Sequence, residues 1–248
     1  DAEDCALGTE TNNTNNVAAE NAFDRNRLRS VVKTADTTYP TMLTTGSRDS
    51  DDVGNTITNN TLDGGYILAS GAQRVRIEGN TVRNWTSTDP NRSPIFLTNV
   101  QNARISRNTL DGTTFAAAVT NGRGLLSLVG VTDAEVVGNI ITGSATGHGI
   151  GCRDCTRVAI RGGLIRDNLG SGIQFYLTNT DVTVDGVSII DNNTSNNGFR
   201  AGIHFSGHAT DGSTTRGVVQ NSTIISPAAD KQAAPFRLDV ANVTLTNN

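Results

Sequence analysis

Apolar and polar residues alternate in short runs along most of the chain. The run from Val75 to Val82 is typical, with apolar side chains at every second position before an Asn and again after it. Alternation with a period of two residues is typical of strands that bury one face. The pattern therefore predicts a succession of short strands joined by tight turns, with little helix.

This run is one copy of a repeat. The copies superimpose without gaps and comprise Val75–Val82, Ala103–Leu110, Ala134–Ile141, Val158–Ile165 and Val182–Ile189. A second apolar phrase precedes the copies at a nearly constant interval, at Tyr66–Ala69, Pro94–Leu97, Leu125–Leu128, Gly149–Cys152, Gly172–Phe175, Gly202–Phe205 and Pro235–Leu238. Repeats separated by one variable segment are typical of a solenoid, so we expect a parallel β-helix of about eight coils, each with three short strands.

An Asn occupies the turn inside the repeat. Asn80, Asn108 and Asn139 align there, Gly163 takes the same place in the next copy, and Val187 interrupts the column. Asn tolerates left-handed backbone angles, and its amide can bond both the backbone and a stacked neighbour. We expect a tight turn supported by a ladder of amides.

These phrases resemble the short V-x-I-x-x-N-T-I repeat of the pectin-lyase-like superfamily, over residues 40–248. The resemblance implies an all-β, right-handed, single-stranded parallel β-helix, with polysaccharide along the outside of its first sheet. The chain departs from that superfamily's enzymes, because it lacks the Asp-Pro-His motif of alginate epimerases, the clustered aspartates of polygalacturonases, and the calcium and arginine motifs of pectate lyases. The resemblance therefore predicts the fold more specifically than the chemistry.

The two ends differ from the repeats. Residues 1–39 are interpreted as an N-terminal arm and a capping helix, because the apolar residues of 21–35 can share one helical face. Such a helix would cover the first coil and protect its open edge. Residues 243–248 begin another repeat copy, which indicates a piece of a longer rod or an assembly of chains, as a trimer or by end-to-end stacking.

The composition disfavours two classes of binding partner, nucleic acids and the membrane interior. The formal charge of −4 provides no basic field for nucleic acid. No apolar stretch reaches the roughly twenty residues needed to cross a bilayer, so no membrane span is expected. The first residues, Asp-Ala-Glu-Asp, fit a chain after signal removal or an excised fragment. We expect a secreted, extracellular or virion-surface protein.

The cysteines and histidines give no cofactor signal. Cys152 aligns with an inward apolar column and Cys155 with Val100 and Val131, so both are expected in the core. His148 and His208 are expected in loops, at a spacing that makes a metal site unfavourable. We therefore predict no metal site and no cofactor. A bound Ca²⁺ is the one case left open, although no motif indicates it.

The outward positions become polar in the later coils. They carry Arg153, Gln174, Tyr176, His204, Arg237 and Asp239. On strands about 5 Å apart these residues predict one exposed strip, the size of one or two sugar rings. Tyr176, His204 and Arg237 are the predicted catalytic residues, and Arg153, Gln174 and Asp239 the predicted substrate-binding residues.

The residue types of this strip fit β-elimination or C5 epimerisation of a uronic acid. Arg237 or Arg153 would neutralise the substrate carboxylate and acidify the adjacent C–H. Tyr176 or His204 would remove the proton, and the other would protonate the leaving oxygen. A polar, solvated sheet face without catalysis is the alternative.

Glycoside hydrolysis is less favoured, because it needs two carboxyl groups about 5.5 to 9.5 Å apart. Asp154 and Asp239 are about three coils, or roughly 14 Å, apart. Asp167 and Asp191 occupy equivalent places on adjacent coils, where a turn role is favoured over a hydrolase pair or a cation site. The insertions at 86–93, 113–124, 192–201 and 226–234 are candidate substrate walls.

Three functional hypotheses remain. The leading one is a secreted β-helix that binds an acidic polysaccharide and cleaves or epimerises it. The second is a non-catalytic structural or glycan-binding β-helix of a phage tailspike or fibre, an adhesin or an extracellular filament. The third and weakest is ice binding by a column of Thr56, Thr81, Thr109 and Thr223.

Overall fold

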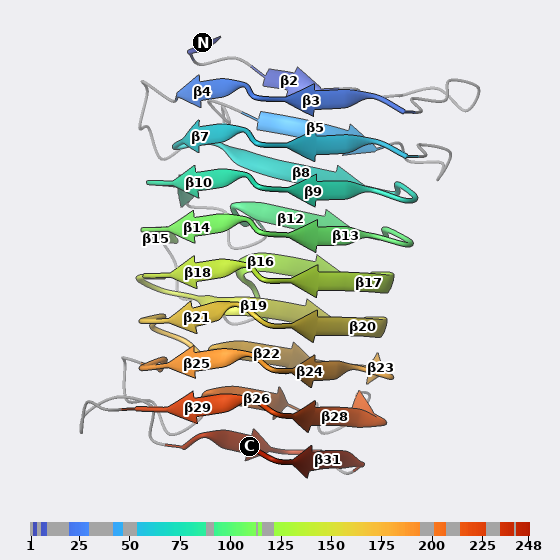
Figure 1. Ribbon diagram of the computed structural model, residues 1–248, viewed down its shortest axis with the longest axis vertical. Helices are drawn as coiled ribbons and strands as arrows, with labels where there is room; N and C mark the ends of the chain where they lie inside the picture. The colour runs from blue at the N-terminus through green and yellow to red at the C-terminus, as the bar shows by residue number, and fades with distance from the viewer. Residues whose placement is uncertain are drawn as a thin grey trace.

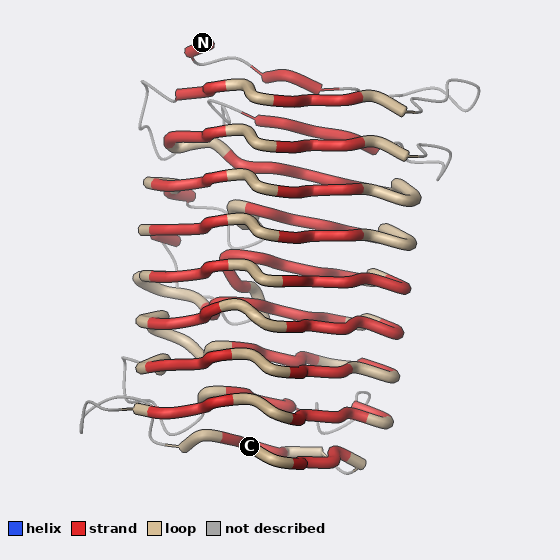
Figure 2. The backbone as a smooth tube through the Cα atoms, in the orientation of Figure 1, coloured by secondary structure: helices blue, strands red, loops and turns tan. Residues whose placement is uncertain are grey.

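The computed structural model places almost all of its secondary structure in three parallel sheets that run along one rod (Figure 1). It describes residues 2–3, 6–8, 20–29, 42–46, 54–87, 92–112, 114–115, 122–193, 201–206, 214–226, 234–240 and 242–248. These residues contain strands and turns and no helix, as Figure 2 shows. Accordingly, the described part of the chain has no helix that could span a membrane.

Sheet A contains the strands that follow the Asn turn. They are β1 (Ala2–Glu3), β4 (Arg27–Arg29), β7 (Thr61–Asp63), β10 (Thr81–Arg83), β14 (Thr109–Asp111), β18 (Ile140–Thr142), β21 (Leu164–Arg166), β25 (Ser188–Ile190) and β29 (Thr223–Ile225).

Sheet B contains the second apolar phrase. Its strands are β2 (Ala6–Gly8), β5 (Met42–Gly46), β8 (Tyr66–Ser70), β12 (Ile95–Thr98), β16 (Gly124–Val129), β19 (His148–Arg153), β22 (Ile173–Tyr176), β26 (Ile203–Ser206) and β30 (Phe236–Leu238).

Sheet C contains the strands that precede the Asn turn. They are β3 (Ala22–Asp24), β6 (Thr56–Thr58), β9 (Arg76–Glu78), β13 (Arg104–Ser106), β17 (Thr132–Val137), β20 (Thr156–Arg161), β24 (Thr183–Asp185), β28 (Gly217–Gln220) and β31 (Val243–Thr246). Two short pairs lie beside these sheets, β11 (Thr86–Ser87) with β15 (Thr114–Phe115), and β23 (Asn179–Thr180) with β27 (Thr214–Thr215).

Each coil takes one strand from sheet B, then one from sheet C and one from sheet A, and the next coil stacks on it in parallel. The register follows the repeat, since Ile67 pairs with Ile95 and Ile95 with Leu126. The predicted all-β parallel β-helix is therefore confirmed. Each sheet stacks nine strands along the rod, and β23 and β27 bring sheet C to eleven. The nine stacked strands are one more than the eight coils expected, because the first coil, from β2 to β4, lies in the segment that was predicted to be an arm and a capping helix.

The predicted capping helix over residues 21–35 is wrong where the structure describes that segment. Residues 22–24 and 27–29 are strands β3 and β4, which pair with β6 and β7. Phe23 and Leu28 point inward on either side of Asn26, whose backbone N–H donates to Asn60 Oδ1 at 2.8 Å. This is the repeat phrase itself, so the sheets continue across the expected boundary at residue 39. Residues 30–41 lie outside the described residues.

The Asn turn contains the expected amide ladder. Asn60, Asn80 and Asn108 each donate their backbone N–H and side-chain amide to the Oδ1 of the next Asn, at 2.9 to 3.0 Å. The left-handed residue is the one before each Asn, such as Asn59, Gly79 or Arg107, with φ between 54° and 67°. The ladder residues therefore contribute hydrogen bonding, and their neighbours supply the left-handed backbone.

The core is a column of stacked aliphatic and aromatic side chains between the three sheets. Phe175 stacks on Phe205 with ring centroids 4.5 Å apart. Cys152 and Cys155 are buried and free of disulfide bonds, which confirms their predicted place in the core. The neighbouring Cys155 thiol and burial both raise the pKa of the Cys152 thiol, so it stays protonated at neutral pH.

Candidate functional site

The polar strip lies on the outer face of sheet B, where the register places its residues in two columns. Gly151, Gln174, His204 and Arg237 are register partners on β19, β22, β26 and β30. In the second column, Arg153 pairs with Tyr176. The alignment predicted from the sequence is therefore correct strand by strand.

Three of the predicted site residues are in direct contact. His204 Nε2 lies 2.8 Å from Asp239 Oδ2. Arg237 Nε donates to both oxygens of the same carboxylate, at 3.1 and 3.0 Å. His204, Asp239 and Arg237, which we call the His204 triad, thus join one strand end of sheet B to the preceding coil.

Burial decides the charge of the triad. His204 is only 6% exposed, and desolvation lowers the pKa of its imidazole although Asp239 opposes that effect. For Asp239 desolvation raises the pKa, but hydrogen bonds from His204 and Arg237 outweigh it and leave the pKa lowered. At neutral pH the triad therefore contains a neutral imidazole and an ionised carboxylate.

These charges assign the tautomer of His204. An ionised carboxylate only accepts hydrogen bonds, so Nε2 carries the proton and donates it to Asp239. Nδ1 then holds a lone pair, and it is buried without a hydrogen-bond partner among the described residues. An oriented neutral imidazole with one unpaired nitrogen is an arrangement that general-base catalysis uses.

The other strip residues lie on the neighbouring strands β19 and β22. The Arg153 guanidinium carbon lies 6.0 Å from the centroid of the Tyr176 ring, and its Nε lies 3.3 Å from Asp154. Gln174 lies between Gly151 and His204 in register and is buried, so it does not belong to an exposed strip as expected. Tyr176 is half-buried.

A chain segment covers the middle of this face. Gly122 and Arg123, just before β16, lie against it, with the Arg123 guanidinium 4.4 Å from the centroid of the Phe96 ring. A Cβ on Gly151 would lie 1.9 Å from the carbonyl oxygen of Gly122, and a Cβ on Gly122 would lie 2.5 Å from Cβ of Tyr176. The segment therefore separates the N-terminal part of the face from the strip.

Gly122 and Arg123 belong to the insertion 113–124, which was predicted to be a substrate wall, but the sequence did not predict that they pack against Gly151 and Tyr176. The only signal was that the outward position of β19 is a glycine, Gly151. Glycine in a strand often marks a place where another backbone approaches closely.

Other candidates have structural places. His148 is the first residue of β19 rather than a loop residue, and its Nδ1 accepts a hydrogen bond from the Ser171 backbone at 2.9 Å. Asp167 and Asp191 have left-handed φ angles of 55° and 50°, which fits their expected turn role. Within the described ranges no group of three or more His, Cys, Asp or Glu residues is arranged to hold a metal ion.

His208 and most of the four insertions lie outside the described residues.

The proposed threonine column is wrong in one member, because Thr56 belongs to sheet C and pairs with Arg76, whereas Thr81 pairs with Thr61 and Thr109. Ile140 and Leu164 then interrupt that column, which weakens the ice-binding hypothesis.

Comparison with known proteins adds a family and several similar structures. A family model described as "Right handed beta helix region" matches residues 48–248. No curated protein sequence matches the chain. The structure resembles the A-module of the mannuronan C-5 epimerase AlgE6 of Azotobacter vinelandii, with a TM-score of 0.59 and 14% identity, over 93% of this chain and 75% of that one. At this identity the likeness establishes a shared fold.

Two further structures are less similar. The enzymatically active domain of tailspike protein 2 of bacteriophage CBA120 gives a TM-score of 0.41 at 11% identity, over 91% of this chain and 43% of that one. The Streptococcus pneumoniae surface protein and adhesin PfbA gives a TM-score of 0.34 at 9% identity, over 97% of this chain and 80% of that one.

Proposed function

The chain belongs to the right-handed β-helix family, and from that premise we propose that it binds an acidic polysaccharide along the later coils of sheet B and acts on it by removing the C5 proton of a uronate unit. The observation that carries this proposal is the His204 triad, with its 2.8 Å contact between His204 Nε2 and Asp239 Oδ2. Lyase and epimerase reactions share this first step.

The strip supplies the residue types that the step requires. The C5 proton is acidic only when the adjacent carboxylate is neutralised, which a guanidinium does by a two-pronged contact. Arg237 and Arg153 both lie on the outer face, and Arg237 is already oriented by Asp239. We assign carboxylate binding to these two arginines; Gln174 is buried and is not assigned a contact with the substrate.

Proton transfer is assigned to His204 and Tyr176. The imidazole is neutral and held by Asp239. Its Nδ1 has no hydrogen-bond partner among the described residues, and because this atom is buried, the substrate must displace the groups that cover it before Nδ1 accepts the proton. In a lyase reaction the electrons released at C5 form a double bond to C4 and expel the glycosidic oxygen, which takes a proton from Tyr176. In an epimerase reaction a proton returns to C5 from the opposite face.

The substrate class is also that of one structural neighbour. The epimerase module that shares this fold is named for C5 chemistry on mannuronan, a uronate polymer. The residue roles are taken from this chain alone. Such a polymer is extracellular, so the proposal places the protein outside the cell or on a virion surface.

Hydrogen exchange at C5 tests the proposal directly. The protein is incubated in D₂O with polygalacturonate, polymannuronate or polyguluronate, and deuterium at C5 is measured by proton NMR while unsaturated product is followed by ultraviolet absorbance. We expect exchange with at least one polymer, and its loss in His204→Gln and Arg237→Gln. Arg216→Gln, which removes an arginine from sheet C, is the matched control and should retain exchange.

A second candidate is a non-catalytic glycan-binding or structural β-helix. The burial of His204 at 6% exposure and the double contact from Arg237 to Asp239 favour it, because both also fit a group that only stabilises the last coils. Polymer binding without C5 exchange, in wild type and variants alike, would decide for this candidate and against the enzyme.

A further inference from the structure

The outer face of sheet C carries charges whose sign alternates from coil to coil in the C-terminal half of the rod. The acidic coil of β17 has Asp133 and Glu135, the basic coil of β20 has Arg157 and Arg161, the acidic coil of β24 has Asp181 and Asp185, and Arg216 precedes β28. Opposite charges on neighbouring strands stabilise a sheet and favour one register.

These alternating charges neutralise one another. Arg157 contacts Asp133 through two bonds of 2.5 and 2.8 Å, and Arg216 Nη2 lies 2.6 Å from Asp181 Oδ2. The bond from Arg216 lowers the pKa of Asp181. Arg157 and Arg216 are therefore each partnered by an acid of the preceding coil.

The alternation fails at β9 and β13. Arg76 and Arg104 are register partners on these adjacent strands, so two like charges lie directly opposite each other. Arg74 lies in the turn before β9, and Arg107 lies in the turn after β13. Like charges in this arrangement destabilise a sheet, unless something else neutralises them.

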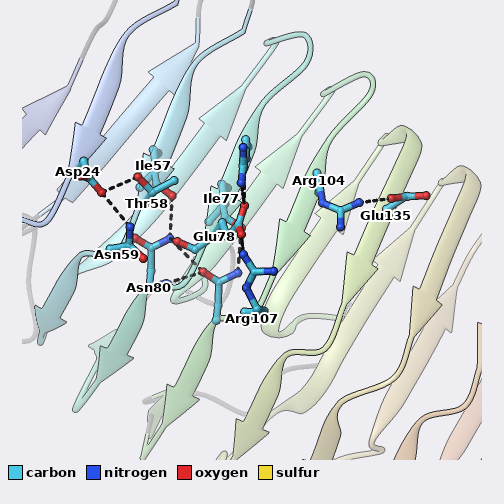
Figure 3. Close-up of polar contacts among 12 residues, drawn as sticks. Asp24, Ile57, Thr58, Asn59, Ile77, Glu78, Asn80, Arg104, Arg107 and Glu135 are labelled. Carbon is cyan, nitrogen blue, oxygen red and sulfur yellow. Dashed lines mark hydrogen bonds and ion pairs between the residues drawn. The ribbon is translucent and has the colours of Figure 1, made fainter.

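The carboxylates near these four arginines are too few to neutralise their positive charges. Arg76 and Arg107 both contact Glu78, which is 5% exposed, and Figure 3 shows Glu78 beside Arg107. Arg104 Nη1 lies 2.5 Å from Glu135, as Figure 3 shows. Arg161 shares the Glu135 carboxylate at 3.3 Å.

The remaining arginine has no acid at all among the residues described. Arg74 is exposed, and no ion pair joins it to the described part of the chain. The side chains of Arg76, Arg104 and Arg107 are 54%, 49% and 69% exposed. Their guanidinium groups can therefore take another anionic partner from solution.

We propose that Arg74, Arg76, Arg104 and Arg107 form a second binding site, on sheet C, for the carboxylate or sulfate groups of an anionic polysaccharide. Guanidinium forks suit both groups, because each presents two oxygens in one plane. A bound anion also relieves the repulsion between Arg76 and Arg104. The surplus charge covers only two coils of a chain with a net charge of −4, which disfavours polyphosphates such as DNA. Only the choice of a polysaccharide rests on the proposed function.

Binding measurements with charge-matched variants test this site. Arg74→Gln/Arg104→Gln removes two of the four charges and leaves Glu78 with both its arginines and Glu135 with Arg161. Arg157→Gln/Arg216→Gln removes the same charge from the alternating half. Dissociation constants are measured by calorimetry at two salt concentrations with polygalacturonate, dextran sulfate, uncharged dextran and a DNA oligonucleotide.

We expect the wild-type protein to bind polygalacturonate or dextran sulfate. Arg74→Gln/Arg104→Gln should weaken that binding by about tenfold and reduce its salt dependence. The control pair should change binding by less than about threefold, since its arginines are already neutralised. If Arg74→Gln/Arg104→Gln does not fold, Arg74→Gln alone, which breaks no ion pair within the described part of the chain, should still weaken binding.

Several results would overturn the site. Equal losses in both pairs, no loss in the first pair, or DNA binding as tight as polygalacturonate binding would each do so. His204→Gln is measured in parallel and should leave binding at sheet C unchanged. Loss of C5 exchange therefore reports on the His204 triad, and loss of binding in Arg74→Gln/Arg104→Gln reports on sheet C.

Discussion

His204 Nε2 lies 2.8 Å from Asp239 Oδ2, although the two residues are 35 positions apart in the sequence. The contact crosses from β26 to the end of β30, between successive coils of sheet B. The contact forms because each coil stacks directly on the one before it, which brings residues far apart in the sequence onto neighbouring strands. It places a buried neutral imidazole against an ionised carboxylate.

The burial of His204 predicts how stability depends on pH. Its pKa is lowered in the folded state, so the unfolded chain binds a proton more readily once the pH falls below the ordinary value of 6.5. The free energy of unfolding should therefore be highest above that pH and decrease as the pH falls from 7.5 to 5. Urea unfolding at several pH values measures the slope.

The variant His204→Gln should lose part of that slope. Asp239 does not interfere, because its lowered pKa costs stability only as the pH falls below about 3.8, the ordinary value for Asp. Identical slopes for wild type and variant would contradict the assigned protonation of His204.

The Asn ladder predicts a large cost for Asn108→Ala. Asn139 would lose a donor, and the backbone N–H of Asn80 would lose its acceptor inside a buried turn. Leaving buried polar groups unpaired costs about 1 to 3 kcal/mol per group, so the free energy of unfolding should fall by at least this amount. Thr109→Ala, at the half-buried next position, is the control and should change stability by less than about 0.5 kcal/mol.

The close approach of Gly122 to Gly151 predicts a local effect of Gly151→Ala. The new Cβ would lie 1.9 Å from the Gly122 carbonyl oxygen, so the chain at Gly122 and Arg123, just before β16, must move away from Gly151. Hydrogen exchange followed by mass spectrometry should show faster exchange of the amides of 122–124. Gly138→Ala, whose Cβ would meet nothing within 4 Å, should leave them unchanged even though it strains a positive φ.

The buried thiols predict slow modification. In a Cys5→Ser chain, Cys152 and Cys155 should react with a thiol reagent only after unfolding, because both are fully buried and burial contributes to the raised pKa of Cys152. Absorbance of the released thiolate measures the rate with and without guanidinium chloride. Rapid reaction of the native protein would show that the turn between these cysteines opens readily.

Much of the fold could be predicted from single residues of the repeat. The phrases that contain Asn80, Asn108 and Asn139 determined which side chains point inward, because a period of two leaves no freedom once one inward residue is known. The same rule applies to Phe23, Asn26 and Leu28, although the short apolar pattern around these residues also fits one face of a helix. Short segments are ambiguous between the two periods, so pairing with β6 and β7 decided that case.

The candidate site could be predicted only in part. The sequence by itself determined that Gln174, His204 and Arg237 lie in one outward column, and it aligned Arg76 with Arg104 on sheet C. Only the tertiary structure decided that Gln174 and His204 are buried, that Asp239 turns back to His204, and that residues 122–124 cover Gly151. The physical reason is that a repeat specifies the direction in which each side chain leaves its strand, whereas segments outside the repeat decide what it meets there.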